Sequence, residues 1–322
     1  MEKSLTISVI TPSFNQGQFI AETIESVLMQ EGEFDLEYII VDGASTDNTL
    51  DIVKSFEQQL FSAGRPVKCN DISFRWISEK DEGQSDAIIK GFAMAKGDVI
   101  AWLNSDDTYI PGALQKIAEF FCGNPSSPVV YGKSFYTDES GRVVGRYPTG
   151  EFDRDRFPAF NFISQPSVFF TRKAYEEIGG IDKTLQFVMD YDLWIRFSQK
   201  FDLEYLPHDL STYRLHEFSK TVSDATAYEN NREVLGVVYK YFGVAPINRV
   251  LAYNFQLMKK ILPVNLGRLT LLTLMLSIPP AVYKYLVMNR KIRIADIRMF
   301  TPANIRKALT GSEDLTMEKI DE

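Results

Sequence analysis

The chain has 322 residues, of which 45% are hydrophobic, and its formal net charge is −8. This length and apolar content allow one large α/β domain with an appendage or two modest domains, and they exclude general disorder. The acidic balance argues against a general nucleic-acid-binding protein.

The cysteines and the first residues bear on the location of the protein. Cys69 and Cys122 lie far apart and belong to no metal-binding or redox motif, as expected of reduced thiols. The sequence opens Met1-Glu2-Lys3-Ser4 and passes directly into a strand-like segment, without the basic and apolar stretches of a secretory signal. We therefore expect a cytoplasmic protein.

The first 107 residues alternate short apolar strands with polar loops and helices. Strands are predicted over residues 5–11, 38–41, 74–78 and 99–103, and helices over residues 19–30, 49–60 and 87–95. This alternation predicts a parallel sheet with helices on its faces. Each of the four strands is followed by a loop that carries Asp or Asn.

The fourth strand ends in Asn104-Ser105-Asp106-Asp107, where ligands of open α/β sheets usually bind. Two adjacent carboxylates repel each other unless a cation lies beside them, so the pair is a candidate site for a divalent ion with bound phosphates. The alternative is a solvated turn in which Asp107 or Thr108 caps the next helix. Capping is also the simpler explanation for Asp47.

No glycine-rich phosphate loop follows any predicted strand. Neither G-x-G-x-x-G nor G-x-x-x-x-G-K occurs there, which disfavours a dinucleotide enzyme that transfers hydride. A protein that holds a diphosphate through a metal fits the sequence better.

Beyond the fourth strand the predicted sheet becomes mixed. A helix is predicted over residues 113–121, a strand from residue 129, a hairpin over residues 135–146, and an extended segment over residues 165–170. Another helix begins near Asp190, with Leu193, Trp194 and Phe197 on one face. By position alone, Asp190 is either the cap of this helix or a functional acid.

The C-terminal part is predicted to be helical over residues 233–242, 249–262 and 266–288. Leu269–Tyr283 carries no charge, but its fifteen residues, with Pro279-Pro280 inside, fall short of the roughly 20 that span a bilayer. Residues 249–310 contain eleven Lys or Arg residues and one acid, Asp296. Three alternatives follow: a helical cover on the first domain, an in-plane anchor on anionic lipid, or a subunit contact.

Four segments, in this order and at these spacings, resemble the family-two inverting glycosyltransferases, and within them the sugar transferases of O-antigen, capsule and exopolysaccharide synthesis. The segments are Thr11-Pro12-Ser13-Phe14-Asn15-Gln16-Gly17-Gln18-Phe19-Ile20, Ile40-Val41-Asp42-Gly43-Ala44-Ser45-Thr46-Asp47-Asn48-Thr49, Asp81-Glu82-Gly83-Gln84-Ser85-Asp86-Ala87 and Asn104-Ser105-Asp106-Asp107. The resemblance runs from about Ser4 to about Ser223. It implies the glycosyltransferase A fold, a Rossmann-like, mostly parallel central sheet with helices on both faces, here with a C-terminal helical extension.

The resemblance also implies which residues bind the nucleotide. Asp42 would accept a hydrogen bond from the base, as the N3–H of uracil requires, and Asp106 would lie at the ribose or the metal. The implied nucleotide-binding residues are Thr11, Pro12, Asn15, Asp42, Ser45, Asp81, Gln84, Asp86 and Asp106.

A metal site and a catalytic base are implied in the same way. Mg²⁺ or Mn²⁺ would bind Asp107, with Asp106 and with His216 of the segment Tyr213-Arg214-Leu215-His216-Glu217-Phe218-Ser219-Lys220, which is similar to a Y-R-x-H-x-x-S-K pattern of the family. Asn104 replaces the first acid of the family's D-x-D motif. Asp190 matches the catalytic base and is preferred to Asp192, although Met189 stands where the family usually has Glu.

The implied activity is inverting, metal-dependent transfer of a hexosyl or N-acetylhexosaminyl group from a nucleotide-diphosphate sugar, expected to be a UDP-sugar. The acceptor would be a hydroxyl of a saccharide or lipid-linked saccharide in cell-surface polysaccharide synthesis. We expect a catalytic domain over residues 1–225, with a nucleotide-binding half (1–107) and an acceptor half (108–225). A helical extension over residues 226–322 would follow, with peripheral contact to the inner face of the cytoplasmic membrane as one option.

Two other functions remain open from the sequence. The chain could be a catalytically silent scaffold of a membrane polysaccharide assembly, because Asn104 and Met189 depart from the family pattern. It could also be a nucleotidyltransferase, which shares the acids, the metal and the parallel sheet, although residues 12–17 lack the basic residues such enzymes use. The sugar, the acceptor and the oligomeric state are not predicted.

Overall fold

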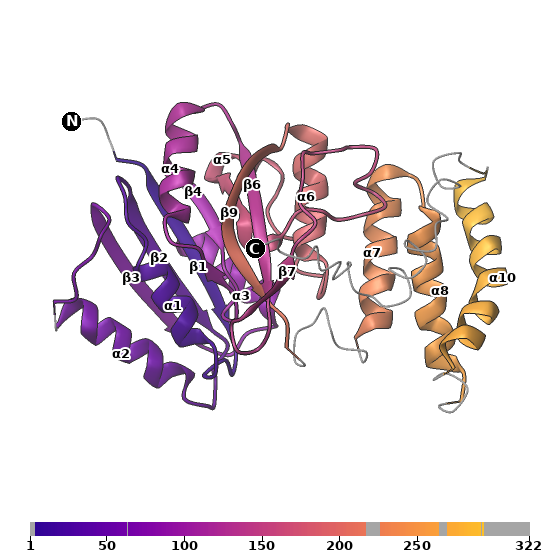
Figure 1. Cartoon of the computed structure of the whole chain (residues 1–322), viewed down its shortest axis with the longest axis horizontal. Coiled ribbons are helices and arrows are strands. Elements are labelled where there is room, and N and C mark those ends of the chain that lie inside the picture. The colour runs from indigo at the N-terminus through magenta and orange to yellow at the C-terminus, as the bar shows by residue number, and fades with distance from the viewer. Residues whose placement is uncertain (1–3, 63, 217–225, 264–268, 291, 293–322) are drawn as a thin grey trace. The chain divides into compact units, whose positions relative to one another are not determined.

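The computed structural model describes residues 4–62, 64–216, 226–263, 269–290 and 292. The chain divides into two compact units (Figure 1). The first takes in the residues up to Phe152 and Phe162–Arg214, and the second takes in Asp153–Asn161 and the described residues from Leu215 on. The domain boundary predicted at residue 225 falls in 217–225, outside the described residues.

The first unit is built on a sheet with the strand order β3-β2-β1-β4-β8-β6-β9-β5, to which β7 adds beside β6. Its first four strands are all parallel: β1 (Thr6–Ser13), β2 (Asp35–Asp42), β3 (Asp71–Ser78) and β4 (Val99–Trp102). The connecting helices are α1 (Ile20–Leu28), α2 (Thr49–Phe61) and α3 (Gln84–Met94). The predicted alternation is confirmed, and it brings the carboxyl ends of four strands to one edge of the sheet.

The other half of the sheet is mixed, as predicted. Its strands are β5 (Thr108–Tyr109), β6 (Val129–Thr137), β7 (Val143–Arg146), β8 (Val168–Thr171) and β9 (Glu204–Arg214). The predicted hairpin is the antiparallel pair β6–β7, whereas β6 and β9 are parallel. The helices of this half are α4 (Ala113–Gly123), α5 (Arg172–Glu177) and α6 (Met189–Lys200), and a 3₁₀ turn, Gln165–Ser167, precedes β8. Strands β5 and β9 and helix α5 were not predicted from the sequence.

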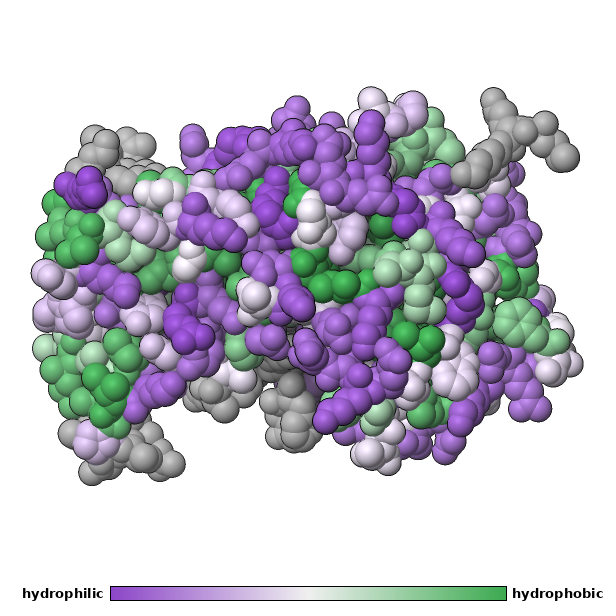
Figure 2. Space-filling view, turned by 180° about the vertical axis from the view of Figure 1, so that it is seen from behind, coloured by the Kyte–Doolittle hydropathy of each residue, from purple (hydrophilic) through white to green (hydrophobic). Residues whose placement is uncertain are grey.

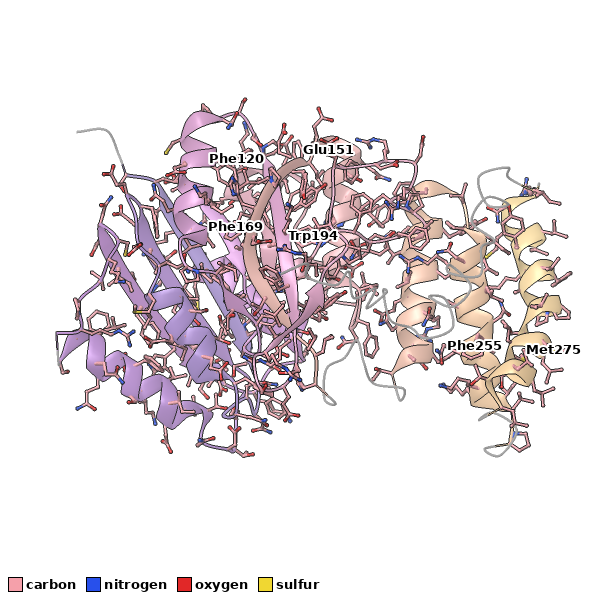
Figure 3. All side chains as sticks on the ribbon, in the orientation of Figure 1. Phe120, Glu151, Phe169, Trp194, Phe255 and Met275 are labelled. Carbon is pink, nitrogen blue, oxygen red and sulfur yellow. The ribbon has the colours of Figure 1, made fainter. Side chains whose placement is uncertain are left out.

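Helices cover both faces of the sheet because strand side chains alternate in direction. On one face, Val9 and its neighbours pack against α1, α2 and α4. On the other, Trp102 stacks on Trp194 of α6 with ring centroids 5.6 Å apart, and Phe92 of α3 meets Trp102 edge-on. Phe169 and Trp194, one from each core layer, are labelled in Figure 3. Large aromatic rings therefore fix the distance between the sheet and the helices on its second face.

The second unit is helical, with α7 (Ala227–Phe242), α8 (Ile247–Ile261) and α10 (Thr270–Asn289). Its small core joins Leu235, Val250 and Leu251 with Ala281 and Tyr285 of α10. Asn289 fixes the end of α10 by exchanging two hydrogen bonds of 2.9 Å with the backbone of Ala245. The three predicted helices are present. The limits of α8 and α10 lie within a few residues of those predicted, and α7 begins six residues before the predicted residue 233.

Helix α10 continues through Pro279-Pro280 and is 20 residues long, longer than the uncharged run of fifteen residues, Leu269–Tyr283. Among the described residues it is the one helix whose length and composition would allow it to cross a membrane. A core helix of a soluble protein can pass the same test, but only 22% of the most apolar part of α10 is buried.

Close contact between α3 and β1 gives a test of this packing. A Cβ atom on Gly91 would lie 2.3 Å from Cγ2 of Ile10, which is buried and cannot move aside. We expect Gly91→Ala to lower the free energy of unfolding by about 1–3 kcal/mol, because overpacking displaces the helix. Urea denaturation followed by tryptophan fluorescence measures the change.

Gly123→Ala is the matched control, since Gly123 is also helical, is exposed and has open space around its Cα. This change should leave stability unaltered or raise it by up to about 1 kcal/mol, because alanine favours the helix. Equal stabilities for the two variants would contradict the packing described here.

Candidate active site

The loops after β1 and β2 are joined through Asp42, the last residue of β2. Its carboxylate is fully buried and accepts hydrogen bonds from the hydroxyl and the N–H of Ser45 and from the hydroxyl of Ser78 (2.7 Å). Ser45 Oγ also accepts the N–H of Asn15, whose Oδ1 accepts the N–H of Thr46, both at 2.8 Å. The predicted residues Asn15, Asp42 and Ser45 therefore form one hydrogen-bonded group.

Two non-glycine residues in these loops have left-handed backbone conformations. The φ angle is +51° at Asn15 and +64° at Ala44. Such conformations are unfavourable for residues with a Cβ atom and persist only where surrounding contacts fix them. Here the fixing contacts are the hydrogen bonds among Asn15, Ser45 and Asp42.

The loop after β3 lies against the same group. Gly43 faces Asp81 so closely that a Cβ atom at residue 43 would lie 2.7 Å from Oδ2 of Asp81. The other carboxylate oxygen of Asp81 accepts the N–H of Gly83 (2.9 Å). The absence of a side chain at residue 43 lets the carboxylate of Asp81 lie against this loop.

A chain of side-chain amides joins this loop to the end of β4. Gln84 Nε2 donates to Oδ1 of Asn104 (2.8 Å), and Asn104 Nδ2 donates to Oε1 of Gln165 (2.9 Å). Gln165 in turn donates to the carbonyl of Trp102 (2.9 Å) and is buried. Asn104 also donates to Oδ2 of Asp107, at 3.3 Å. An aspartate at residue 104 would lose both donated bonds and would add a third carboxylate beside Asp107.

Asp106 and Asp107 are held mainly through the backbone. The N–H of Arg214 donates to Oδ1 of Asp107 (2.9 Å), and its guanidinium Nε donates to the carbonyl of Asp106 (2.9 Å). The hydroxyl of Thr23 in α1 donates to the carbonyl of Asp107 (2.8 Å). Arg214 is buried and also pairs with Glu22. Arginine at this position therefore fixes the acid loop between β9 and α1.

The electrostatics of the pair suit a bound cation. Burial, and next the charge of Asp106, raise the pKa of Asp107 well above its ordinary value, while hydrogen bonds from Arg214 and Asn104 act in the opposite direction. A divalent ion beside Asp106 and Asp107 would remove the unfavourable energy of the charged form. Mg²⁺ commonly binds one or two carboxylates together with substrate phosphates and water. The two acids fit such an ion.

A site made by protein side chains alone is not seen. In the part of the chain that the structure describes, no group of three or more His, Cys, Asp or Glu residues is arranged to hold a metal ion. His216 is buried and follows Arg214 by two residues, but it belongs to the second unit. Its role as a metal ligand with Asp106 and Asp107 stays a prediction.

Asp190 lies in the first turn of α6, as predicted, and is partly exposed. The start of this helix is fastened to α3, because the hydroxyl of Ser85 lies 2.8 Å from the carbonyl of Leu185 and 3.0 Å from the sulfur of Met189. Ser85 directly follows Gln84, which binds Asn104, so the start of α6 lies beside the start of α3. Asp192 is fully buried and forms an ion pair with Arg196 (2.6 Å).

Three predicted residues have other partners in the structure. Thr11 is buried and its hydroxyl lies 3.1 Å from that of Tyr38 in the core, and Pro12 is buried beside Val41. Helix α3 begins at Gln84, earlier than predicted, which places Asp86 one turn before Lys90. The hydrogen bond from Lys90 lowers the pKa of Asp86, and the two form an ion pair of 3.1 Å.

Asp47 has the structural role that the sequence suggested. It accepts hydrogen bonds from the N–H of Thr49 (3.0 Å) at the start of α2 and from the N–H of Gly17 (2.9 Å). Burial acts to raise its pKa, but these bonds and one from the Thr49 hydroxyl outweigh it, so the pKa is lowered.

Three residues of the site were missed as candidates in the sequence. They are Ser78, which binds Asp42, Ser85, which fastens α6, and Gln165, which binds Asn104. Each of them binds a residue that is far away in the sequence. Arg214 stands in the segment that is similar to the family's Y-R-x-H-x-x-S-K pattern, but its contacts with Asp106 and Asp107 were not predicted.

The model of the family "Glycosyl transferase family 2" matches residues 8–179 of this chain. Among curated proteins, an uncharacterized glycosyltransferase of Nostoc sp. is 36% identical over 117 residues, which are 36% of this chain and 33% of that protein. Chondroitin synthase of Escherichia coli is 24% identical over 260 residues, covering 78% of this chain and 36% of the synthase. The chain thus matches about a third of the length of these two relatives.

Solved structures show the same fold. The crystal structure of S. aureus TarS 1–349 in complex with UDP-GlcNAc matches with a TM-score of 0.57 and 16% identity, covering 89% of this chain and 91% of that one. The predicted glycosyltransferase A fold is thereby confirmed, with the C-terminal helices present. Because the family model spans more than half of the sequence, the chain belongs to glycosyltransferase family 2.

Proposed function

We propose that this protein transfers a sugar from a nucleotide-diphosphate sugar to a hydroxyl group, with inversion at the anomeric carbon. The observation that carries the proposal is the assembly of side chains at the carboxyl edge of the sheet. Polar groups that follow four parallel strands are joined by hydrogen bonds of Asp42, Gln84 and Asn104, and Asp81 lies against Gly43. This edge is where ligands of such sheets bind.

UDP is the proposed nucleotide. Support comes from the similar fold of S. aureus TarS, whose structures include complexes with UDP and UDP-GlcNAc. Asp42 has four lone-pair sites on its two oxygens and uses three for Ser45 and Ser78, so one can accept the N3–H of uracil.

Asp190 is the proposed general base. Its carboxylate would take the proton of the acceptor hydroxyl as the oxygen attacks the anomeric carbon, and the bond to the diphosphate breaks on the opposite face. Asp192 is unsuited to this role because its carboxylate is buried and paired with Arg196. The contacts of Ser85 with Leu185 and Met189 would hold the first turn of α6 in place during this step.

Asp106 and Asp107 are the proposed ligands of Mg²⁺ or Mn²⁺, and His216 is a further proposed ligand. When bound, the ion would neutralise the charge that develops on the diphosphate leaving group. Asn104 orients Asp107 by donating to Oδ2, and Arg214 keeps the loop in place. Thr11, Pro12, Asp81 and Asp86 keep their proposed places around the nucleotide.

The acceptor is proposed to be a saccharide or a lipid-linked saccharide, on the cytoplasmic side of a membrane. Curated relatives include proteins named chondroitin synthase and PGL/p-HBAD biosynthesis glycosyltransferase. Family membership favours sugar transfer over the nucleotidyltransferase alternative. A catalytically silent scaffold would bind the donor without hydrolysing or transferring it, and the first experiment below distinguishes this case.

We expect Asp190→Asn to lower kcat by about 10²–10⁴-fold, because the amide cannot accept the proton. Binding of UDP and the melting temperature should be unchanged, since Asp190 is partly exposed at a helix start. Release of UDP from a UDP-sugar, with and without saccharide acceptors, measures turnover. Wild-type turnover by this variant would reject Asp190 as the base, and no turnover by the wild-type protein would favour the scaffold.

Asp192→Asn is the matched comparison, two residues along the same helix. It leaves Arg196 buried without its carboxylate partner, so we expect it to lower the free energy of unfolding by about 3 kcal/mol while the folded protein keeps its kcat. If Asp192→Asn loses kcat and Asp190→Asn does not, Asp192 is the general base and the proposal for Asp190 is wrong.

The metal proposal is tested by calorimetry of UDP binding in Mn²⁺ and in chelator. We expect Asp107→Asn to remove the difference between the two conditions, because the amide cannot supply the charge that holds the ion. The fold should survive, since the amide oxygen can still accept the N–H of Arg214. In chelator the variant should melt at or above the wild-type temperature, because an unfavourable buried charge is absent.

Asp51→Asn serves as the control, since Asp51 is an exposed acid in the first turn of α2. It should keep the full metal dependence. If Asp107→Asn binds UDP in Mn²⁺ as tightly as the wild-type protein, the acids are not metal ligands.

A further inference from the structure

Helix α10 directs its smaller and more polar residues inward. Its buried residues are Thr273, Ser277, Ala281 and Tyr285, which repeat every four positions and so form one stripe. Ala281 and Tyr285 of this stripe pack against Val250 and Leu251 of α8. In water-soluble helices the large apolar side chains usually form the buried stripe, so the pattern of α10 is reversed.

The large apolar residues of α10 face outward. Leu271 and Tyr283 are 72% and 73% exposed, and Met275, labelled in Figure 3, is 61% exposed. The exposed apolar face of α10 consists of Leu271, Met275, Leu276, Ile278, Val282, Tyr283, Leu286 and Val287. Figure 2 shows hydrophobic side chains gathered over this helix, at the left edge of that view. A continuous exposed apolar face of this kind marks a contact surface.

A basic residue, Arg290, lies at the C-terminal end of this face, and the sequence that follows is also basic. Lys284 lies on α10 itself, with its ammonium group 4.2 Å from the ring centre of Tyr253 on α8, and Arg290 caps the end of α10. In the sequence, Lys291, Arg293 and Arg298 follow with one acid, Asp296, between them. An apolar surface with a basic end is complementary to a bilayer that contains anionic lipid.

The packing of α10 decides between lying on a bilayer and crossing it. Lys284 meets Tyr253 and Asn289 meets Ala245, so α10 runs beside α8. Helix α8 carries Lys259 and Lys260 at its end. A spanning α10 would draw these charges and the polar groups of α7 and α8 into hydrocarbon, where charge is costly.

We propose that the exposed apolar face of α10 binds the surface of an anionic lipid bilayer, with the helix in the plane of the membrane. The face would enter the boundary between headgroups and acyl chains, while Arg290 at the end of the helix meets lipid phosphates. This proposal does not depend on the sugar-transfer activity. It predicts the location of the second unit, whether or not the first unit is catalytic.

Sedimentation with lipid vesicles tests the proposal on the full chain. We expect binding to vesicles of 30% phosphatidylglycerol in phosphatidylcholine, weaker binding to phosphatidylcholine alone, and a decrease when salt is raised. The variant Leu271→Gln, Met275→Gln, Val282→Gln should bind at least about tenfold more weakly, because three apolar side chains no longer leave water. These positions are exposed, so circular dichroism and the melting temperature should not change.

A matched control carries the same number of changes at exposed apolar positions of the first unit: Met29→Gln, Phe61→Gln and Val67→Gln. This variant should bind vesicles as the wild-type protein does. A second measurement uses Tyr283→Trp, whose additional fluorescence should shift to shorter wavelength on vesicle binding and be quenched by brominated lipid. Trp76, Trp102 and Trp194 of the first unit serve as the background in the wild-type protein.

Several outcomes would overturn the proposal. Failure of the wild-type chain to bind anionic vesicles, or equal binding by the α10 variant, would remove the lipid surface as the partner. A wild-type dimer in sedimentation velocity that the same α10 changes dissociate, without vesicle binding, would assign the face to a second copy of the chain. Binding to cell membranes that survives carbonate at high pH would indicate a spanning helix.

Discussion

The burial of one carboxylate, Asp107, beside a second, Asp106, governs this site. Asp106 and Asp107 lie at the end of a buried strand, where burial and next the charge of Asp106 make the charged form of Asp107 unfavourable. The fold offsets this cost with an N–H from Arg214, an amide from Asn104 and, for the backbone, the hydroxyl of Thr23. These partners come from β9, from the loop after β4 and from α1, so the position of one acid pair depends on three separate parts of the first unit. The family pattern has an acid where this chain has Asn104. The amide lowers the electrostatic cost of the acid pair, because it adds a hydrogen-bond donor to Asp107 instead of a third negative charge.

The parallel half of the fold could be predicted because each of its elements has a local signature. Apolar strands of four to eight residues alternate with amphipathic helices, and no distant information is needed to recognise them. Strand β9 has no such signature, since it contains Pro207 and charged residues, and its pairing with β6 shifts register beside Lys133. Proline is tolerated there because the register shift interrupts the ladder, so no strand hydrogen bond at residue 207 is lost for want of an N–H group. The two-residue strand β5 exists only through its pairing with β9.

The site divides in the same way. Sequence order places Asn15, Asp42 and Asp107 at one edge of the sheet, because they follow strands that are parallel. Their partners could not be predicted, because Gln165 and Arg214 lie far from them in the sequence and no local pattern separates a buried amide or guanidinium from a solvated one. Asp86 was expected in the loop after β3. It lies instead in the first turn of α3 and pairs with Lys90, because the helix begins three residues earlier than the periodicity of the sequence indicated.

The left-handed backbone at Asn15 and Ala44 bears on the thermodynamics of ligand binding. A loop that must become ordered around its ligand loses conformational entropy, at roughly 1–2 kcal/mol for each residue fixed. Here Asn15, Ser45 and Asp42 are already locked together. Folding has therefore met that entropic cost, together with the local strain, before any nucleotide arrives. The affinity for a ligand at this edge then depends mainly on the hydrogen bonds that protein and ligand exchange with water. The association rate does not include a step in which the loop becomes ordered.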